Sequence, residues 1–146
     1  MEDLEKLFRR YARRKAARWW VGERPVGRDG APGRSIASRL GYPTGDLDPF
    51  ATDRMVRLTR DQAAHVLAVA GTLSLVMDTY APRQGRLEEA RAALAGLKAD
   101  ATFLSNGYWG LNEDTGWIPL TKATFDSGVI GYDADRAFIF WVEEED

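Results

Sequence analysis

The chain has no cysteine among its 146 residues, and this absence excludes several kinds of site at once. Disulfides, zinc sites built on thiolates and cysteine nucleophiles all require that residue. A chain without cysteine also suits a reducing compartment, so we expect a cytoplasmic protein. We expect no metal and no cofactor.

Histidine is nearly as scarce, because His65 is the only one. A serine–histidine–aspartate triad would have to use it, yet no nucleophile motif surrounds Ser74 or Ser105. The paired acids Asp133 and Asp135 stand at an expected turn, where aspartate side chains cap local backbone amides. The sequence therefore predicts that this protein is not an enzyme.

Long apolar runs are also missing. The longest extends from Ala63 to Met77 and is interrupted by His65 and Thr72, so it falls short of the roughly 20 residues that a membrane-spanning helix needs. The N-terminal residues Met1-Glu2-Asp3 do not begin a secretory signal. We expect a soluble protein with no membrane partner.

What the chain does contain is enough apolar material for one core. Hydrophobic residues make up 45% and aromatic residues 11% of the sequence, and this length is typical of a single domain. We expect residues 1–146 to form one domain with three regions. These are a basic helix with a Gly/Pro-rich loop in 1–50, a helical core in 59–100 and an antiparallel sheet in 108–142.

Helical spacing of apolar residues marks the first two regions. It predicts a helix over residues 2–20, which begins with acids and continues with a run of cations that suits the helix dipole. Thr59 and Gln62 have the spacing of a capping box, so a second helix should begin near Arg60 and continue to about Tyr80. A third helix is predicted over roughly 86–99.

The pattern changes near Ser105, where aromatic and β-branched residues gather between turn residues. The predicted strands are Tyr108–Leu111, Trp117–Leu120, Gly128–Tyr132 and Ala137–Val142. A four-residue turn at 133–136 joins the last two into a hairpin. The predicted fold class is α+β, with N-terminal helices packed on a small C-terminal antiparallel sheet that ends in a β-hairpin.

Charge divides the chain into two halves. Residues 1–60 carry fourteen Lys and Arg against eight Asp and Glu, whereas residues 61–146 carry six against fourteen. Such an asymmetry gives more information about binding partners than about the fold. It favours binding over catalysis.

Our leading hypothesis is a protein–protein binding function through an acidic, aromatic C-terminal surface, as in an inhibitor, an immunity protein or a phage accessory protein. Acids speed encounter with a basic partner, and aromatic side chains supply binding energy. The predicted contact residues are Trp109, Glu113, Asp114, Trp117, Trp141, Glu143, Glu144, Glu145 and Asp146. A homodimer stays open as another assembly.

The alternative is a nucleic-acid-binding accessory factor that uses the basic N-terminal third. The predicted phosphate contacts are Arg9, Arg10, Arg13, Arg14, Arg28 and Arg34.

A short segment near these arginines has a local resemblance of its own. Residues 36–41 resemble the first helix and turn of a helix-turn-helix motif, which implies a recognition helix after Gly41. Pro49 opposes that helix, because proline inside a helix costs about 3 kcal/mol. The sequence favours a short helix over 36–40 that Ser35 caps.

Overall fold

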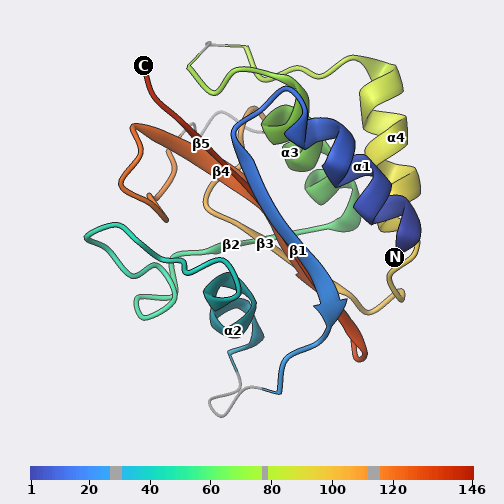
Figure 1. Cartoon of the computed structure of the whole chain (residues 1–146), viewed down its shortest axis with the longest axis horizontal. Coiled ribbons are helices and arrows are strands. Elements are labelled where there is room, and N and C mark those ends of the chain that lie inside the picture. The colour runs from blue at the N-terminus through green and yellow to red at the C-terminus, as the bar shows by residue number, and fades with distance from the viewer. Residues whose placement is uncertain (27–30, 77–78, 112–115) are drawn as a thin grey trace.

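A computed structural model of the chain describes residues 1–26, 31–76, 79–111 and 116–146. The elements in chain order are α1 (Glu2–Ala12), β1 (Ala17–Glu23), α2 (Pro32–Ser38), β2 (Val56–Leu58), α3 (Arg60–Thr72), α4 (Gln84–Leu94), β3 (Thr102–Ser105), β4 (Phe125–Tyr132) and β5 (Arg136–Glu144). The predicted α+β class is confirmed, with an antiparallel sheet that ends in the β4–β5 hairpin (Figure 1).

The strands lie side by side in the order β1-β5-β4-β3-β2. The predicted hairpin turn is also present, because the carboxylate of Asp133 accepts hydrogen bonds from the amides of Asp135 and Arg136 at 2.9 and 2.8 Å. The same carboxylate accepts from the amide of Lys98, which fastens the turn to the segment after α4. Aspartate is favoured here because its side chain satisfies amides that the turn leaves without partners.

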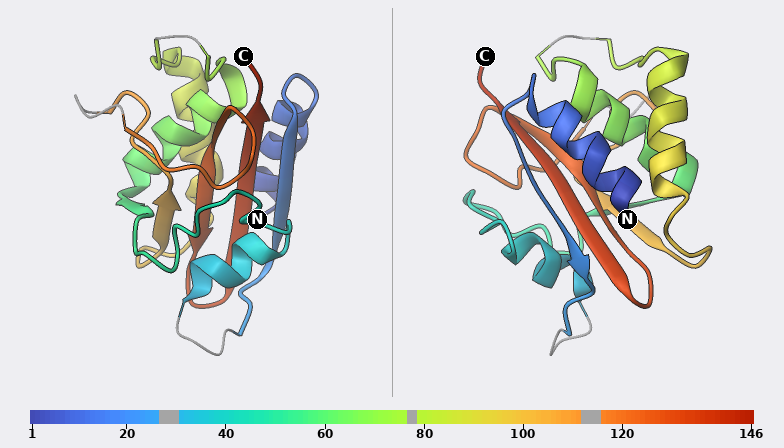
Figure 2. Two further views of the ribbon diagram at one scale, coloured as in Figure 1. Left: turned by 90° about the vertical axis from the view of Figure 1, so that its left-hand side faces the viewer. Right: turned by 45° about the vertical axis from the view of Figure 1, so that its right-hand side comes forward.

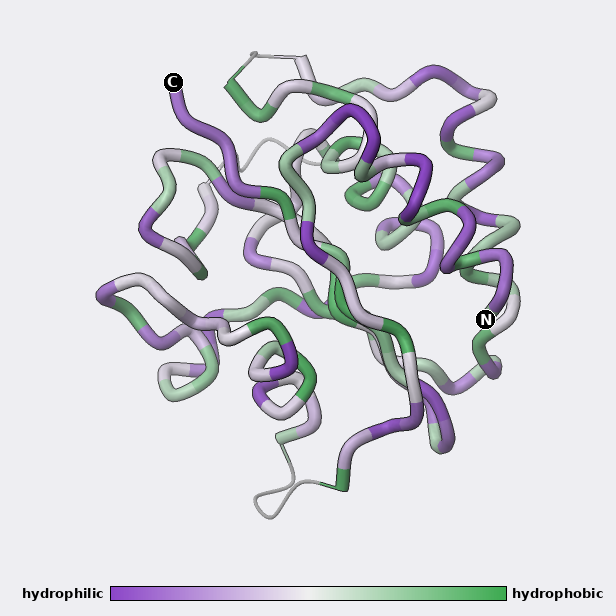
Figure 3. The backbone as a smooth tube through the Cα atoms, viewed as in Figure 1, coloured by the Kyte–Doolittle hydropathy of each residue, from purple (hydrophilic) through white to green (hydrophobic). Residues whose placement is uncertain are grey.

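Helices cover both faces of the sheet. α1, α3 and α4 lie on one face and α2 lies on the other, as the two views of Figure 2 show. Because side chains alternate along a strand, β5 sends Phe138 and Phe140 to the three-helix face and Ile139 and Trp141 to the α2 face. This explains why β5 is apolar at consecutive positions, which is visible as hydrophobic colour through the middle of the tube in Figure 3.

The two cores differ in size. The larger contains, among others, Leu4, Leu7, Phe8, Leu67, Leu94, Phe138 and Phe140. The smaller contains, among others, Ile36, Leu40, Tyr42, Leu120, Ile139 and Trp141.

The predicted start of the central helix is confirmed and its predicted end is wrong. The amide of Gln62 donates to the hydroxyl of Thr59 at 3.2 Å, and the amide of Thr59 donates to the side chain of Gln62 at 2.9 Å. α3 ends at Thr72 rather than near Tyr80, because the next residue, Leu73, is extended. Lys15 and Glu144, which are far away in the sequence, bind the residues that follow α3, as described below.

The first predicted helix is wrong beyond Ala12. Residues 17–23 form β1, which pairs with β5 from Ala17 opposite Val142 to Glu23 opposite Arg136. The apolar pattern here fits a period of two as well as it fits a helix, and Trp19 and Trp20 pack toward opposite faces. Pairing with the central hairpin decides between the two periods.

Other boundaries are also corrected. α2 begins with proline in its first turn, and Ser35 lies inside it rather than capping it. No helix follows between α2 and α3, so the recognition helix implied by the helix-turn-helix resemblance does not form.

Two predicted strands fail as well. Residues 108–111 form a turn, and Trp117 makes only an isolated bridge to Gly107. The short strands β2 and β3 take their place in the sheet. In the part of the chain that the structure describes, no helix has both the length and the apolar character to cross a bilayer.

Candidate functional site

The four C-terminal acids, residues 143–146, form what we call the acidic tail. The phenol of Tyr42 donates to Glu143 at 2.9 Å, and the hydroxyl of Thr124 donates to Glu145. Glu144 accepts from the amide of Leu75 at 2.7 Å and forms an ion pair with Lys15 at 3.0 Å. Three of the four acids in this tail therefore already bind groups of their own chain.

The predicted aromatic contacts lie mostly inside the protein. Trp141 is fully buried and its indole donates to Asp126 at 3.0 Å. Trp109 is only 4% exposed and its indole donates to the side chain of Asn106 at 3.1 Å. These two predicted contact residues are corrected, because neither indole is available to a partner.

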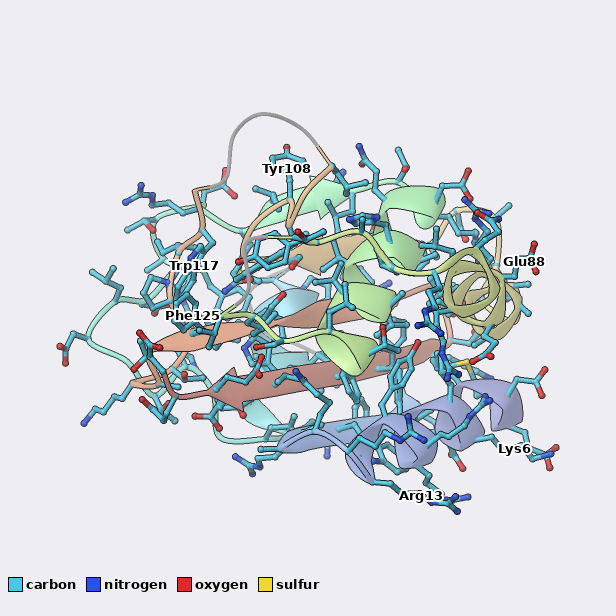
Figure 4. The ribbon with its side chains drawn as sticks, turned by 90° about the horizontal axis from the view of Figure 1, so that it is seen from above. Lys6, Arg13, Glu88, Tyr108, Trp117 and Phe125 are labelled. Carbon is cyan, nitrogen blue, oxygen red and sulfur yellow. The ribbon has the colours of Figure 1, made fainter. Side chains whose placement is uncertain are left out.

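Trp117 is the exception, since it is half-buried and stacks on Phe125 with ring centroids 6.0 Å apart (Figure 4). Glu113 and Asp114 lie outside the described residues.

Asp126 is the polar centre of this region. Its buried carboxylate accepts hydrogen bonds from the indole of Trp141, the amide of Leu120, and both the amide and the hydroxyl of Thr121. Burial raises the pKa of Asp126, and these donors work in the opposite direction. Its oxygens are occupied by protein donors, so this acid fixes the fold around β4 and β5.

The predicted basic contacts separate into groups. Arg34 forms an ion pair with Asp48 at 2.7 Å and lies over the ring of Phe50, next to α2. Arg9 lies over Trp19. Arg28 lies outside the described residues.

Arg10, Arg13 and Arg14 behave differently, because they converge on one pocket of about 810 Å³. We call it the cationic pocket. Its walls come from the end of α1 and the turn after it, from the end of α3 and the segment that follows, from the start of α4, and from β5. The lining residues are Arg10, Tyr11, Arg13, Arg14, Lys15, Gly71, Thr72, Leu73, Ser74, Arg83, Arg86 and Glu144.

Figure 4 looks down on this end of the molecule. Arg13 projects outward from α1, on the opposite side of the view from Tyr108. The C-terminal half of α1 is also hydrophilic along its outer side in Figure 3. The pocket therefore opens at a surface that is already rich in cations.

Positive charge exceeds negative charge here. Six cations line the pocket, and among the described residues the carboxylates that pair with them are Glu89 and Glu144, which leaves a net charge of +4 from these groups. Glu89 forms ion pairs with two arginines, Arg10 at 3.4 Å and Arg86 at 3.3 Å. The charge of the pocket favours a ligand with several negative charges.

Three of the six cations have no acidic partner in the part of the chain that the structure describes. Among the described residues, no carboxylate lies within 4.0 Å of Arg13, Arg14 or Arg83. A guanidinium without a partner offers several N–H donors in a planar arrangement that matches phosphate oxygens.

Lys15 is held in place from two sides. Its ammonium donates to the carbonyl of Leu73 and pairs with Glu144, and its side chain is only 11% exposed. These contacts hold Lys15 against the residue that directly follows α3. They also make β5 a wall of the pocket.

Tyr11 adds a neutral donor to this charged surface. It is 5% exposed, and its hydroxyl, which is itself buried, has no hydrogen-bond partner among the described residues. Burial first, and then the charge of Glu89, raises the pKa of Tyr11, so the phenol stays protonated at neutral pH. A buried polar group without a partner costs about 1–3 kcal/mol, which calls for an explanation.

The ring of Tyr11 fits closely against Gly71 of α3. A Cβ at position 71 would lie 2.3 Å from that ring, which is far inside van der Waals contact. Glycine therefore allows Tyr11 to lie across the end of α3, where it lines the pocket.

Sequence reasoning found only half of this site. It singled out Arg10, Arg13 and Arg14 from the acid-free run in α1. It does not identify Arg83 and Arg86, because their closeness to α1 depends on how α4 packs, and it gives Tyr11 no role in binding. The signal that could have found the rest is the second group of arginines at the start of the helix after Pro82.

Comparison of the chain with protein-family models, with curated proteins and with solved structures gave no match. Within residues 1–26, 31–76, 79–111 and 116–146, no group of three or more His, Asp or Glu side chains is arranged to hold a metal ion.

Proposed function

We propose that this protein binds nucleic acid, with the cationic pocket as its phosphate-binding site. The observation that carries the proposal is the convergence of six cations from separate segments on one concave surface. Neutralising backbone phosphates with Lys and Arg is the main source of sequence-independent affinity for nucleic acid.

The shape of the pocket favours a single strand over a duplex. A pocket of about 810 Å³ between helix ends can enclose one or two nucleotides, whereas duplex recognition usually needs an element that enters a groove. A flexible strand can turn into such a pocket. Single-stranded binding sites commonly consist of a positively charged groove of this kind.

The first test measures binding of a fluorescent single-stranded 12-mer by anisotropy at several salt concentrations. Changing Arg13, Arg14 and Arg83 to Ala removes the three cations that lack acidic partners among the described residues, so affinity should fall at least tenfold. The slope of log K against log salt should become shallower by about 2, since each phosphate contact in a single strand contributes about 0.7.

The matched control changes Arg54, Arg57 and Lys122 to Ala. These three cations are exposed, lie outside the cationic pocket and carry the same total charge. The control should lose much less affinity than the pocket variant. Equal losses in the two variants, or no binding by the wild type below about 10 µM at low salt, would contradict the proposal.

The protein–protein hypothesis stays a prediction. Among the described residues, its surface is reduced to the half-buried Trp117, the exposed Asp146 and those edges of Glu143, Glu144 and Glu145 that their own partners leave open. An inhibitor, immunity or phage accessory role would have to use this smaller patch. Capture of one protein from nuclease-treated native cytoplasm would favour it over nucleic-acid binding.

A further inference from the structure

We infer that the cationic pocket recognises the terminal phosphate of a nucleic-acid strand, with the phenol of Tyr11 as a hydrogen-bond donor to that phosphate. The inference rests on the proposed nucleic-acid binding and adds the part of the ligand that enters the pocket. Its starting point is the unpartnered hydroxyl of a side chain that is 5% exposed and lines the pocket.

The surroundings of Tyr11 suit a phosphate oxygen. Arg10 and Arg86 are close enough to act on the ionisation of the phenol, and both line the same pocket. A ligand oxygen that reaches Tyr11 would therefore meet a neutral O–H donor together with two guanidinium groups. Neutral and charged donors that converge in this way are typical of sites that fix the orientation of a phosphate.

The net charge of the pocket distinguishes a terminal phosphate from an internal one. A phosphomonoester carries about −1.5 to −2 charges at neutral pH and has three unesterified oxygens. An internal phosphodiester carries a single charge and has two such oxygens. The net charge of +4 that the described residues give the pocket therefore stabilises a strand end more than a strand interior.

The shape of the pocket also favours a terminal phosphate over an internal one. Segments from α1, α3, α4 and β5 enclose it, and Lys15 together with Glu144 fixes the β5 side. An internal phosphate must leave room for the strand to continue in two directions. A terminal phosphate needs only one opening.

The experiment compares three fluorescent 12-mers of one sequence, with a 5′-phosphate, with a 3′-phosphate, or with hydroxyls at both ends. The wild type should bind one of the phosphorylated strands about tenfold more tightly than the unphosphorylated strand. The Tyr11→Phe variant keeps the ring against Gly71 and should reduce this preference to less than threefold. Its affinity for the unphosphorylated strand should change by less than twofold, and its melting temperature should be equal to or above that of the wild type.

The control is Tyr108→Phe, which removes a phenol hydroxyl outside the pocket and should keep the full preference. Equal affinity of the wild type for all three strands would overturn the inference and leave the proposed function standing. No binding of any strand would overturn the proposed function itself.

Two further outcomes bear on single parts of the inference. An unchanged preference in Tyr11→Phe would overturn the role of Tyr11. Competition by a nucleoside monophosphate as strong as that by the phosphorylated strand would show that the pocket takes a free phosphorylated molecule instead.

Discussion

The acidic tail and the cationic pocket are both dense in charge, yet their side chains are used in opposite ways. In the tail, Glu143, Glu144 and Glu145 each bind a group of their own chain. In the pocket, Arg13, Arg14 and Arg83 have no acidic partner among the described residues. The charge of a segment therefore says little about binding until its internal partners are known.

The largest loss of stability is expected for a change at Glu144, which belongs to the acidic tail and also lines the cationic pocket. Glu144→Ala leaves Lys15 without its ion pair and the amide of Leu75 without its acceptor. We expect the free energy of unfolding to fall by about 3 kcal/mol, because the ammonium of Lys15 and the amide of Leu75 are both partly buried. Denaturant unfolding measures this loss.

Asp146→Ala is the control for this variant, since Asp146 is an exposed acid of the same tail. It should change the free energy of unfolding by no more than about 0.5 kcal/mol. Similar small values for both variants would mean that the tail is a free surface after all.

The next largest loss of stability is expected at Gly71, against which the ring of Tyr11 packs. Gly71→Ala places a methyl group 2.3 Å from the ring of Tyr11. Overpacking typically costs about 1–3 kcal/mol, and alanine regains up to about 1 kcal/mol in helix propensity, so a net loss of about 1 kcal/mol is expected. Thermal unfolding would test it, with Gly85→Ala as the comparison because a Cβ at position 85 meets nothing within 4 Å.

A smaller effect is expected in how the stability of the fold depends on pH. Burial works against ionisation of Asp133, but the amides of Lys98, Asp135 and Arg136 hold its pKa below the usual value. Stabilisation by this carboxylate is therefore complete above about pH 4 and is lost as pH falls through its folded pKa. Asp126 acts in the opposite direction, because burial raises its pKa and protonation then favours the folded state.

Asp133→Asn should accordingly flatten the decrease in melting temperature below about pH 4. Asp100→Asn, at an exposed acid, should leave that decrease as it is in the wild type. A decrease that is equally steep in all three proteins would show that Asp133 does not contribute to it.

The smallest effect is expected for the cations without acidic partners. Changing Arg13 to Ala removes no ion pair with a described residue, so the free energy of unfolding should change by less than about 0.5 kcal/mol. A loss near 2 kcal/mol in denaturant unfolding would show that Arg13 is structural, and the contrast with the acidic tail would disappear.

Local signals predicted the parts of the fold that depend on neighbouring residues. The capping box at Thr59 and Gln62 and the turn at Asp133 are each complete within a few residues. The strand β1 is different, because its sequence suits a helix and a strand alike until β5 lies beside it. Tertiary pairing overrides local preference at such positions.

The same distinction applies to the site. The arginines of α1 are visible as a run in the sequence, but their grouping with Arg83 and Arg86 depends on how α1 and α4 pack. Trp141 shows the converse, because the sequence places it in a strand but does not show that α2 and the residues around it bury its side chain. Burial and closeness in space are properties of packed elements, which no single segment specifies.

The pairing of β1 with β5 also bears on how the molecule is made. Ala17 lies opposite Val142, so the two strands close a loop that spans most of the chain. Contacts between residues so far apart form slowly, because the chain must first lose the entropy of that loop. During synthesis on the ribosome, α1 would present its arginines long before residues 136–144 arrive to complete the pocket with Glu144. A nascent chain at that stage has the charge for attraction to the surrounding RNA but not yet the walls for selectivity.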